Sequence, residues 1–543
     1  MSFTYFHCYL PETWEGQVNC GLIDGNAGIR FCQTVTVREE YKFNRLAARG
    51  GELWNLLREQ RLPFYIDRLQ GGCYMDEYPY DRELVQAYRE LLGDRFFGFQ
   101  MHEWMNNLRA DIRKLDRGGC TDWTVPNIEA TIRRLYPGKH LFLEAMTAGE
   151  YAAAGRPDTI EAFLDLSRAL LERRLRHCGG DLITCDSSSL SYPIEVAAGV
   201  RKTMPEIGAQ TPDTRVQMAF TRGMAKAYGM QFGAYLEPWS GKPATACCYH
   251  REGKNEWGLY GKDFPYQATG ENGGSSRSMQ KRMQIYAYFS GASFMAEEWG
   301  MCNTFYDWKD FALSPYGKVK YGFLQLVKKY PDIGTPYKPI ALVISKELPV
   351  LPELDAVDTL YRYPVSGALA ARLNAAREGI RALLASPAPM CGNETRALIN
   401  SDLPDVFDIV DDANPEVLKR YAYLVNLTGD AATERYGSCL RAEEVPMRLR
   451  ELLPCTVEGN AHWFLNRTAA GWLLIILNND GILRTPERGE VALPEGCHSV
   501  TVRLRGGREL RGLEGNAPER AEDGSYRIRI PAGEWFLGGF AQD

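Results

Sequence analysis

The feature that most constrains this fold is a regular alternation of apolar, strand-like runs with amphipathic helical segments, from about residue 28 to residue 345. Seven strand-then-helix units follow one another, and a glycine often closes the helix, as at Gly93, Gly179 and Gly229. This alternation predicts a parallel sheet, and one further strand would complete a closed (β/α)8 barrel. A doubly wound open sheet is the alternative.

The expected strands lie in seven runs, and an eighth must come from one of two places. The seven are GIRFCQTV (28–35), PFYIDRL (63–69), FFGFQMHEW (96–104), LFLEAMT (141–147), DLITCDSSSL (181–190), FGAYLEPW (232–239) and ASFMAEEWG (292–300). The eighth strand is FTYFHCYL (3–10), after which we expect no helix before residue 28, or IALVIS (340–345). With the first choice, the run 96–104 is strand 4 and the run 232–239 is strand 7.

The pattern changes after Pro339. Residues 338–440 combine apolar runs with a long helical segment, which predicts a small open α/β domain. From about residue 441 short strands separated by Gly, Asn and Pro predict an antiparallel β-sandwich. We therefore expect a barrel domain over 1–337, an α/β domain over 338–440 and a β-sandwich over 441–543.

Charge and cysteine usage exclude several functional classes. The net charge is −6 without a block of Lys or Arg, so we expect no nucleic-acid partner. No run approaches the roughly 18 apolar residues of a membrane span, and the start shows no secretion signal, so we expect a cytoplasmic protein without membrane contact. The 14 cysteines form no CxxC pair and only seven histidines are present, so we expect buried thiols, no metal site and no cofactor. The alternative is a metal enzyme in which Asp67, Glu103 and Asp186 bind a cation that prefers oxygen ligands.

Acidic residues recur where the expected strands end. A single buried carboxylate is most simply one half of a salt bridge. Here, however, no comparable set of Lys or Arg occupies the strand ends, with Arg68 as the main exception. Because the strand ends of a barrel share one mouth, these carboxylates predict an active site there. The set comprises Asp67, Glu103, Glu144, Asp186, Glu237, Glu297 and Glu298.

Three of these glutamates stand next to tryptophan in the sequence, namely in Glu103-Trp104, Glu237-Pro238-Trp239 and Glu298-Trp299. Glycoside cleavage uses one carboxyl group to protonate the leaving oxygen and a second as nucleophile or base, beside aromatic faces that stack on sugar rings. The pattern therefore predicts a glycosidase acting on an oligosaccharide or glycoside. A non-catalytic carbohydrate-binding or scaffold barrel is the alternative. Side chains alternate along a strand, so we expect His102 to point away from Glu103 and to be structural.

The layout as a whole resembles the retaining (β/α)8 glycoside hydrolases, and in particular the family 42 β-galactosidases. The resemblance rests on YFSGASFMAEEWG followed by LSPYGKVKYGFLQL, and on KPIALVISKE as the start of a second domain. It implies a flavodoxin-like second domain used in oligomer contacts, and hence a homo-oligomer. It also implies Glu103 as acid/base on strand 4 and Glu237 as nucleophile on strand 7. His102 stands where that clan usually has asparagine.

Glu298 is the third catalytic candidate, as a ligand of sugar hydroxyl groups or, in a competing assignment, as the nucleophile. Retaining chemistry requires the two catalytic carboxyl groups to be about 5 to 5.5 Å apart, and inverting chemistry about 6.5 to 9.5 Å. The expected substrate-binding residues are Asp67, Trp104, Glu144, Asp186, Tyr235, Trp239, Glu297 and Trp299.

Overall fold

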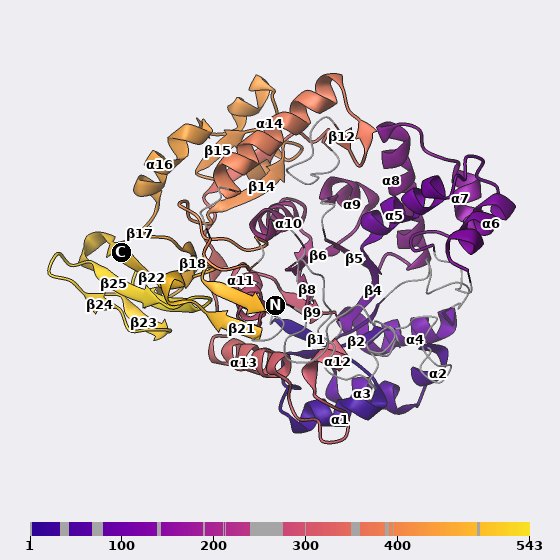
Figure 1. The fold of residues 1–543 in the computed structure, drawn as a ribbon, viewed down its shortest axis with the longest axis horizontal. Coiled ribbons are helices and arrows are strands. Elements are labelled where there is room, and N and C mark those ends of the chain that lie inside the picture. The colour runs from indigo at the N-terminus through magenta and orange to yellow at the C-terminus, as the bar shows by residue number, and fades with distance from the viewer. Residues whose placement is uncertain are drawn as a thin grey trace.

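A computed structural model gives the fold as one closed barrel followed by several smaller sheets (Figure 1). None of its described helices is long and apolar enough to cross a membrane. The structure describes residues 3–32, 43–67, 80–137, 143–187, 191–209, 211, 213–238, 275–298, 300–348, 359–385, 390–394, 396–485 and 489–542.

Eight parallel strands close into the barrel, which excludes the open doubly wound sheet. The sheet has no edge, because β9 pairs with β1 and β5 pairs with β6. The run 3–10 supplies the first strand, as expected from one of the two alternatives. In ring order the eight strands are β1 (Thr4–Cys8), β2 (Ala27–Cys32), β3 (Phe64–Asp67), β4 (Phe96–His102), β5 (Leu182–Asp186), β6 (Lys202–Gly208), β8 (Ala234–Glu237) and β9 (Phe294–Glu297). The short strand β7 (Gln231–Phe232) precedes β8 and pairs with β6.

Two errors in the expected strand list cancel each other. The described part of the run 141–147, residues 143–147, is not a strand. Conversely, β6 forms from KTMPEIG, which the sequence pattern did not identify as a strand. Pro205 within that run argues against a central strand, and its polar neighbours hide the apolar pattern. Since one strand is lost and one gained between β4 and β8, these remain strands 4 and 7.

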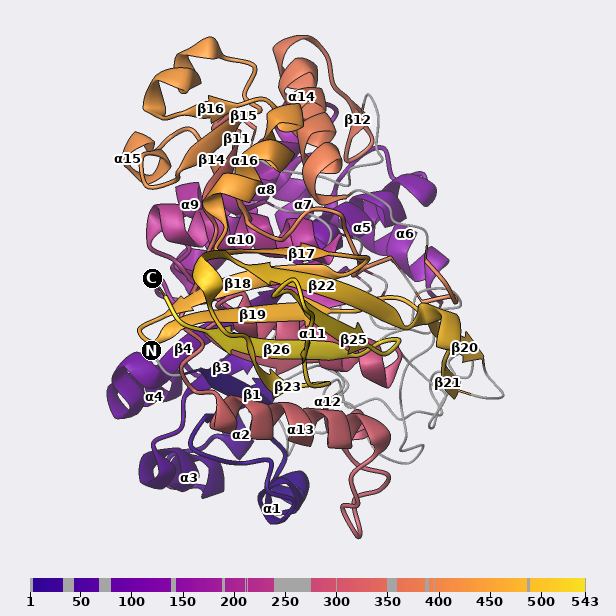
Figure 2. The same ribbon diagram turned by 90° about the vertical axis from the view of Figure 1, so that its left-hand side faces the viewer.

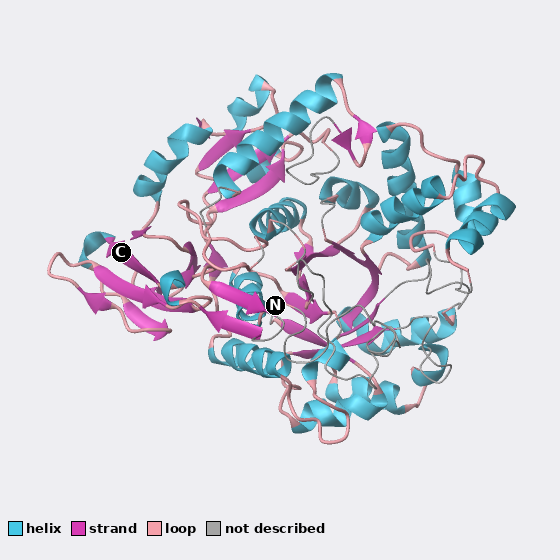
Figure 3. Ribbon diagram, in the orientation of Figure 1, coloured by secondary structure: helices cyan, strands magenta, loops and turns pink. Residues whose placement is uncertain are grey.

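Helices surround the barrel, as Figure 3 shows. The expectation of no helix between the first two strands was wrong, because α1 lies between them. Pro11 is the first residue of this helix, a position that favours proline. Asp81, Thr124, Thr159, Ser276 and Ser314 cap later helices with their side-chain oxygens. The helices are α1 (Pro11–Asn19), α2 (Phe43–Leu46), α3 (Glu52–Gln60), α4 (Arg82–Leu92), α5 (Trp104–Arg117), α6 (Val125–Leu135), α7 (Ala148–Ala154), α8 (Ile160–His177), α9 (Tyr192–Ala198), α10 (Thr214–Tyr228), α11 (Arg277–Phe289), α12 (Gly300–Thr304) and α13 (Pro315–Lys329).

The interior of the barrel is a packed apolar core, as is usual for this fold. Its side chains come from seven of the eight strands and are at most 9% exposed. This core fills the barrel between its two ends, so the polar groups at the carboxyl ends of the strands lie next to apolar side chains. The core comprises Phe6, Tyr65, Phe97, Ile183, Cys185, Met204, Tyr235, Phe294 and Ala296.

A four-stranded parallel sheet follows the barrel, in the order β14-β11-β15-β16. The run 340–345 forms its strand β11 (Ile340–Ile344), so it is not a barrel strand. The helix α14 (Gly367–Leu384) packs against β11, whereas the hairpin of β12 (Thr359–Leu360) and β13 (Tyr363–Pro364) contacts Phe163 of α8. Its other elements are β14 (Phe407–Asp411), α15 (Pro415–Leu418), β15 (Tyr423–Asn426) and β16 (Cys439–Leu440), and α16 (Val445–Leu452) follows them.

The C-terminal part of the chain is antiparallel, and Figure 2 shows its sheets crossing in front of the barrel. One sheet has the order β10-β18-β19-β26-β23, another the order β17-β22-β25-β24, and β20 pairs with β21. On these sheets we propose the domain division 1–337, 338–440 and 441–543. The strands are β10 (Thr335–Pro336), β17 (Cys455–Glu458), β18 (His462–Thr468), β19 (Gly471–Leu477), β20 (Ile482–Thr485), β21 (Gly489–Ala492), β22 (His498–Leu504), β23 (Arg511–Glu514), β24 (Glu519–Arg520), β25 (Tyr526–Ile530) and β26 (Trp535–Phe540).

A buried charge network joins the barrel to both later parts. Its centre is Asp405, which is 0% exposed and lies 3.0 Å from Lys338 Nζ. Tyr286 of α11 donates a hydrogen bond to Asp405, and Arg222 of α10 and His462 of β18 lie at 3.9 and 3.6 Å. The cations around Asp405 hold the pKa of its carboxyl group well below the ordinary value despite burial.

Gly223 allows α10 to approach this second sheet closely. A Cβ atom at Gly223 would lie 2.1 Å from the carbonyl oxygen of Ile409 in β14. Gly223→Ala is therefore expected to lower the free energy of unfolding by about 1–3 kcal/mol, the usual cost of overpacking. Gly322→Ala in α13 is the control, because, apart from its own helix backbone, no atom of the described residues lies within 4 Å of its Cβ position. Urea denaturation of both variants tests this, and equal stability would contradict the close contact.

His462 is expected to make stability depend on pH. Burial lowers its pKa to about 4 in the folded protein, against about 6.5 in an unfolded chain. The unfolded chain therefore binds more protons between these values, so the free energy of unfolding falls as pH drops from about 6.5 to about 4. His462→Gln removes this contribution. Urea denaturation at several pH values should show a shallower fall for the variant, and an identical fall would contradict the assignment.

Candidate active site

Four glutamates and one histidine meet at the carboxyl ends of the barrel strands. Glu103 follows β4, Glu206 lies in β6, Glu237 ends β8 and Glu298 follows β9. His102, the last residue of β4, lies between them. Its Nε2 atom is 3.6 Å from Glu206 Oε1, 3.6 Å from Glu298 Oε1 and 3.8 Å from Glu103 Oε2.

The expected orientation of His102 was wrong. Alternation along a strand would place His102 and Glu103 on opposite sides. Glu103, however, has left the strand: its φ of 44° and ψ of 41° are left-handed, and it precedes the first residue of α5. This turn brings both side chains to the same site. A non-glycine residue in this conformation is strained, and such strain often occurs at functional sites.

Glu103 is the most accessible of these carboxyl groups. Its side chain is 30% exposed, against 2% for Glu298 and 0% for Glu206. Ser187 donates a hydrogen bond of 3.2 Å to Glu103 Oε1, and Asn106 in turn donates to Ser187. Asn106 therefore reaches the site through a serine that follows β5.

Three carboxyl groups converge at this point. One oxygen each of Glu103, Glu206 and Glu237 lies within 4.8 Å of the other two. Gly208 ends β6 beside Glu237, and a Cβ atom there would lie 2.7 Å from Glu237 Cβ and 3.3 Å from its Oε2. Glycine at position 208 thus leaves the space that the Glu237 side chain occupies.

Glu206 is the functional candidate that the sequence analysis missed. Burial, with the charges of Glu237 and Glu103, raises its pKa well above the ordinary value. Neither of its carboxyl oxygens has a hydrogen-bond partner among the described residues. The signal that could have identified Glu206 is the strand β6 itself, since a glutamate near its carboxyl end belongs with the other acidic strand ends.

Three of the predicted substrate-binding residues lie in contacts within the barrel. Asp67 forms an ion pair with Arg30 of β2, and both side chains are 0% exposed. Arg30 also donates to the hydroxyl oxygen of Tyr235 and to the carbonyl oxygen of Glu297. The Glu297 carboxylate forms an ion pair with Lys320 of α13 and accepts a hydrogen bond from Tyr5.

The structure does not bring Trp104 or Glu144 into the glutamate cluster, and Asp186 lies near Glu103 without belonging to the converging sets. Trp104 is 1% exposed in the apolar core, where its indole donates to Glu195. Glu144 forms an ion pair with Lys114 of α5. Asp186 accepts a hydrogen bond of 3.0 Å from the backbone N–H of Met105 near the start of α5.

Burial and the adjacent Glu103 raise the pKa of Asp186 to about 8. Trp239 and Trp299, together with Arg68, lie outside the described residues.

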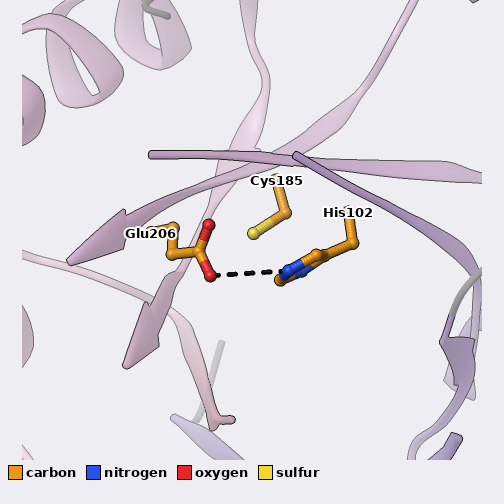
Figure 4. Close-up of side chains that lie close together, drawn as sticks. All are labelled: His102, Cys185 and Glu206. Atoms are coloured by element: carbon orange, nitrogen blue, oxygen red, sulfur yellow. Dashed lines mark ion pairs between the residues drawn. The ribbon is translucent and has the colours of Figure 1, made fainter. Parts of the chain in front are cut away.

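The cluster offers two kinds of chemistry. Carboxyl groups at this separation can act as a proton donor and a nucleophile on one bond. The same groups provide two sets of metal-ligand type, Glu103–Glu206–Glu237 and His102–Cys185–Glu206, each with its atoms within 4.8 Å of one another. Figure 4 shows the second set, in which the three side chains point toward one another.

Comparison with known proteins identifies the fold but no family. No protein-family model matches the sequence, and no curated protein matches it. Among solved structures, Gan42B, a GH42 β-galactosidase, is similar over 100% of this chain and 98% of its own, with 8% identity and a TM-score of 0.50.

A catalytic mutant of Gan42B from G. stearothermophilus gives 8% identity and a TM-score of 0.51, over the same shares of the two chains. α-L-fucosidase isoenzyme 2 from Paenibacillus thiaminolyticus gives 9% and 0.46, over 100% of each chain. At these identities the likeness to Gan42B shows a shared fold.

Proposed function

We propose that this protein is a glycoside hydrolase that cleaves a glycosidic bond with retention of anomeric configuration, with Glu103 and Glu237 as its catalytic pair. The observation that supports this most strongly is the convergence of their carboxyl oxygens to within 4.8 Å at the mouth of the barrel. That upper limit lies below the roughly 6.5–9.5 Å of inverting enzymes and is closer to the roughly 5–5.5 Å of retaining ones, which favours retention.

The exposure of the two side chains favours Glu103 as the acid/base and Glu237 as the nucleophile. Glu103 is the more accessible, so it protonates the leaving oxygen as the aglycone departs toward solvent. Glu237 attacks the anomeric carbon from the opposite face and forms a covalent glycosyl-enzyme. Glu103, now a carboxylate, then removes a proton from water, and the resulting attack releases the sugar.

The remaining groups of the cluster position the catalytic pair and the sugar. We propose that Glu298 accepts hydrogen bonds from sugar hydroxyl groups, since it lies beside His102 on the strand next to Glu237. His102 lies among the carboxyl groups, with its Nε2 atom within 4 Å of Glu103, Glu206 and Glu298, and so helps to position them. The contacts of Asp67 and Glu297 with Arg30 and Lys320 favour a role in holding the strand ends in place.

β-Galactosides are the first substrates to test, because the solved structures with TM-scores of 0.50 and 0.51 are of a β-galactosidase. A panel of nitrophenyl glycosides incubated with the full chain should contain one that is hydrolysed. Proton NMR during the first turnovers should then show the product in the anomeric configuration of the substrate. Binding of sugars without any turnover would favour the alternative of a non-catalytic carbohydrate-binding protein, and an inverted product would exclude the proposed mechanism.

A further inference from the structure

We propose that His102, Cys185 and Glu206 bind a divalent cation of the zinc class at the floor of the site. The three residues come from the ends of β4, β5 and β6, which are neighbours in the barrel. Figure 4 shows their side chains facing one another, and one ligand atom of each lies within 4.8 Å of the other two.

The spacing fits a shared ion better than it fits direct hydrogen bonds. His102 Nε2 and Glu206 Oε1 are 3.6 Å apart, beyond a normal hydrogen bond. Ligands held about 2.0–2.3 Å from a tetrahedral zinc ion lie about 3.3–3.8 Å from one another. The observed separation therefore matches that of two ligands on one ion.

Glu206 provides an independent reason to expect a bound cation. It is 0% exposed, and neither carboxyl oxygen accepts a hydrogen bond from a described residue. A buried carboxyl group without partners costs free energy. Apart from His102 at 3.6 Å, the groups whose charges act on it, Glu237, Glu103 and Glu298 among them, are acidic. A cation would satisfy the oxygens of Glu206 and reduce the repulsion within the cluster.

The donor atoms determine which cation fits. A thiolate, an imidazole and a carboxylate suit zinc and related transition metals, whereas Mg²⁺ and Ca²⁺ require oxygen ligands. Three protein ligands also leave a fourth position open. The carboxyl groups of Glu103 and Glu298, each with an oxygen within 4 Å of His102 Nε2, lie next to this set of ligands.

Gln100 can fix the imidazole in the form that a metal requires. Its side-chain amide lies 3.3 Å from His102 Nδ1, and its Oε1 atom has no partner among the described residues. A half-turn of the side-chain amide exchanges the positions of its oxygen and nitrogen. With the oxygen toward the ring, Nδ1–H donates to Gln100 and Nε2 carries the lone pair that coordinates the cation, a common arrangement around metal-bound histidine.

Cobalt(II) titration of the full chain tests this site without depending on any sugar. The protein is first treated with a chelator and then titrated with Co²⁺ alone. We expect one equivalent to bind, with a thiolate-to-metal charge-transfer band and the visible bands of a four-coordinate ion. Zn²⁺ should displace the Co²⁺ and abolish both. Since the wild-type spectrum itself reports thiolate coordination, this result does not depend on the folding of a variant.

Matched variants assign the ligands. Cys185→Ser should remove the charge-transfer band, and Glu206→Gln should weaken binding by at least about 100-fold, more than loss of a supporting residue usually costs. Two controls should leave the spectrum and affinity unchanged. Cys455→Ser alters another fully buried cysteine, and Glu195→Gln alters a buried carboxyl group that already accepts hydrogen bonds from Thr184 and Trp104.

Three results would overturn the proposal. They are binding of less than a tenth of an equivalent, a Co²⁺ spectrum without a thiolate band, and a band that persists in Cys185→Ser. None of these bears on glycosidase activity, which the hydrolysis of glycosides tests separately.

Discussion

Glu237→Gln is expected to lower kcat for a cleaved glycoside by on the order of 10⁴-fold or more, since a nucleophile has no substitute in the site. Glu103→Gln should lower it by about 10²- to 10⁴-fold, the usual contribution of a general acid. Neither change should lower the melting temperature, because each removes one member of a group of converging carboxyl groups that repel one another.

The control for both is Glu129→Gln on α6, whose partner is Arg133 in the same helix at 2.9 Å. It should retain wild-type kcat. Turnover measurements on purified variants, with thermal denaturation alongside, test the assignment. If Glu298→Gln abolished turnover and Glu237→Gln did not, the competing nucleophile would be correct.

Asp405→Ala is expected to lower the free energy of unfolding by about 3–5 kcal/mol, the cost of removing one partner of a buried ion pair. Arg222 would then keep its charge in a buried site without this carboxylate, and Lys338, whose pKa is already lowered to about 7 by burial, would lose the group that favours its charged form. Because Asp405 also meets Tyr286 and His462, the loss affects the contact of the barrel with both later parts.

An exposed ion pair of similar length provides the control for this stability prediction. Asp523 lies 2.6 Å from Arg503, and both side chains are about half exposed. Solvent screens such pairs, so Asp523→Ala should leave the urea midpoint nearly unchanged. Equal effects of the two substitutions would show that the Asp405 network does not stabilise the assembly of the sheets.

The barrel could be predicted because its signal is repeated along the chain. Each apolar strand followed by an amphipathic helix supports the same architecture, so losing the run 141–147 and gaining 202–208 did not change the outcome. Individual strands were less predictable. Pro205 and the polar residues of β6 conceal a strand that exists because neighbouring strands on both sides pair with it.

The site was only partly predictable, because side-chain partners come from distant parts of the sequence. Asp67, Glu144 and Glu297 were grouped with the catalytic glutamates since no cations stood at the strand ends. Their partners are Arg30 in β2, Lys114 in α5 and Lys320 in α13. A search for cations at the ends of the expected strands does not find these residues.

Local backbone geometry accounts for the error at His102. The left-handed conformation of Glu103 cannot be predicted from residue types, since the sequence His102-Glu103-Trp104 contains no glycine or proline to mark the end of the strand. The same turn accounts for the position of the Trp104 side chain. As the first residue of α5 it packs into the core and donates to Glu195, so its place next to Glu103 in the sequence does not bring its ring to the glutamate cluster.

The most direct test of the central claim is to trap the covalent intermediate and locate it. A 2-deoxy-2-fluoro glycoside with an activated leaving group, of the sugar found in the substrate screen, should inactivate the enzyme in proportion to time. Mass spectrometry of the digested protein should then find one sugar on the peptide that contains Glu237. A label on Glu298 instead, or hydrolysis with inversion and no covalent adduct, would contradict the account.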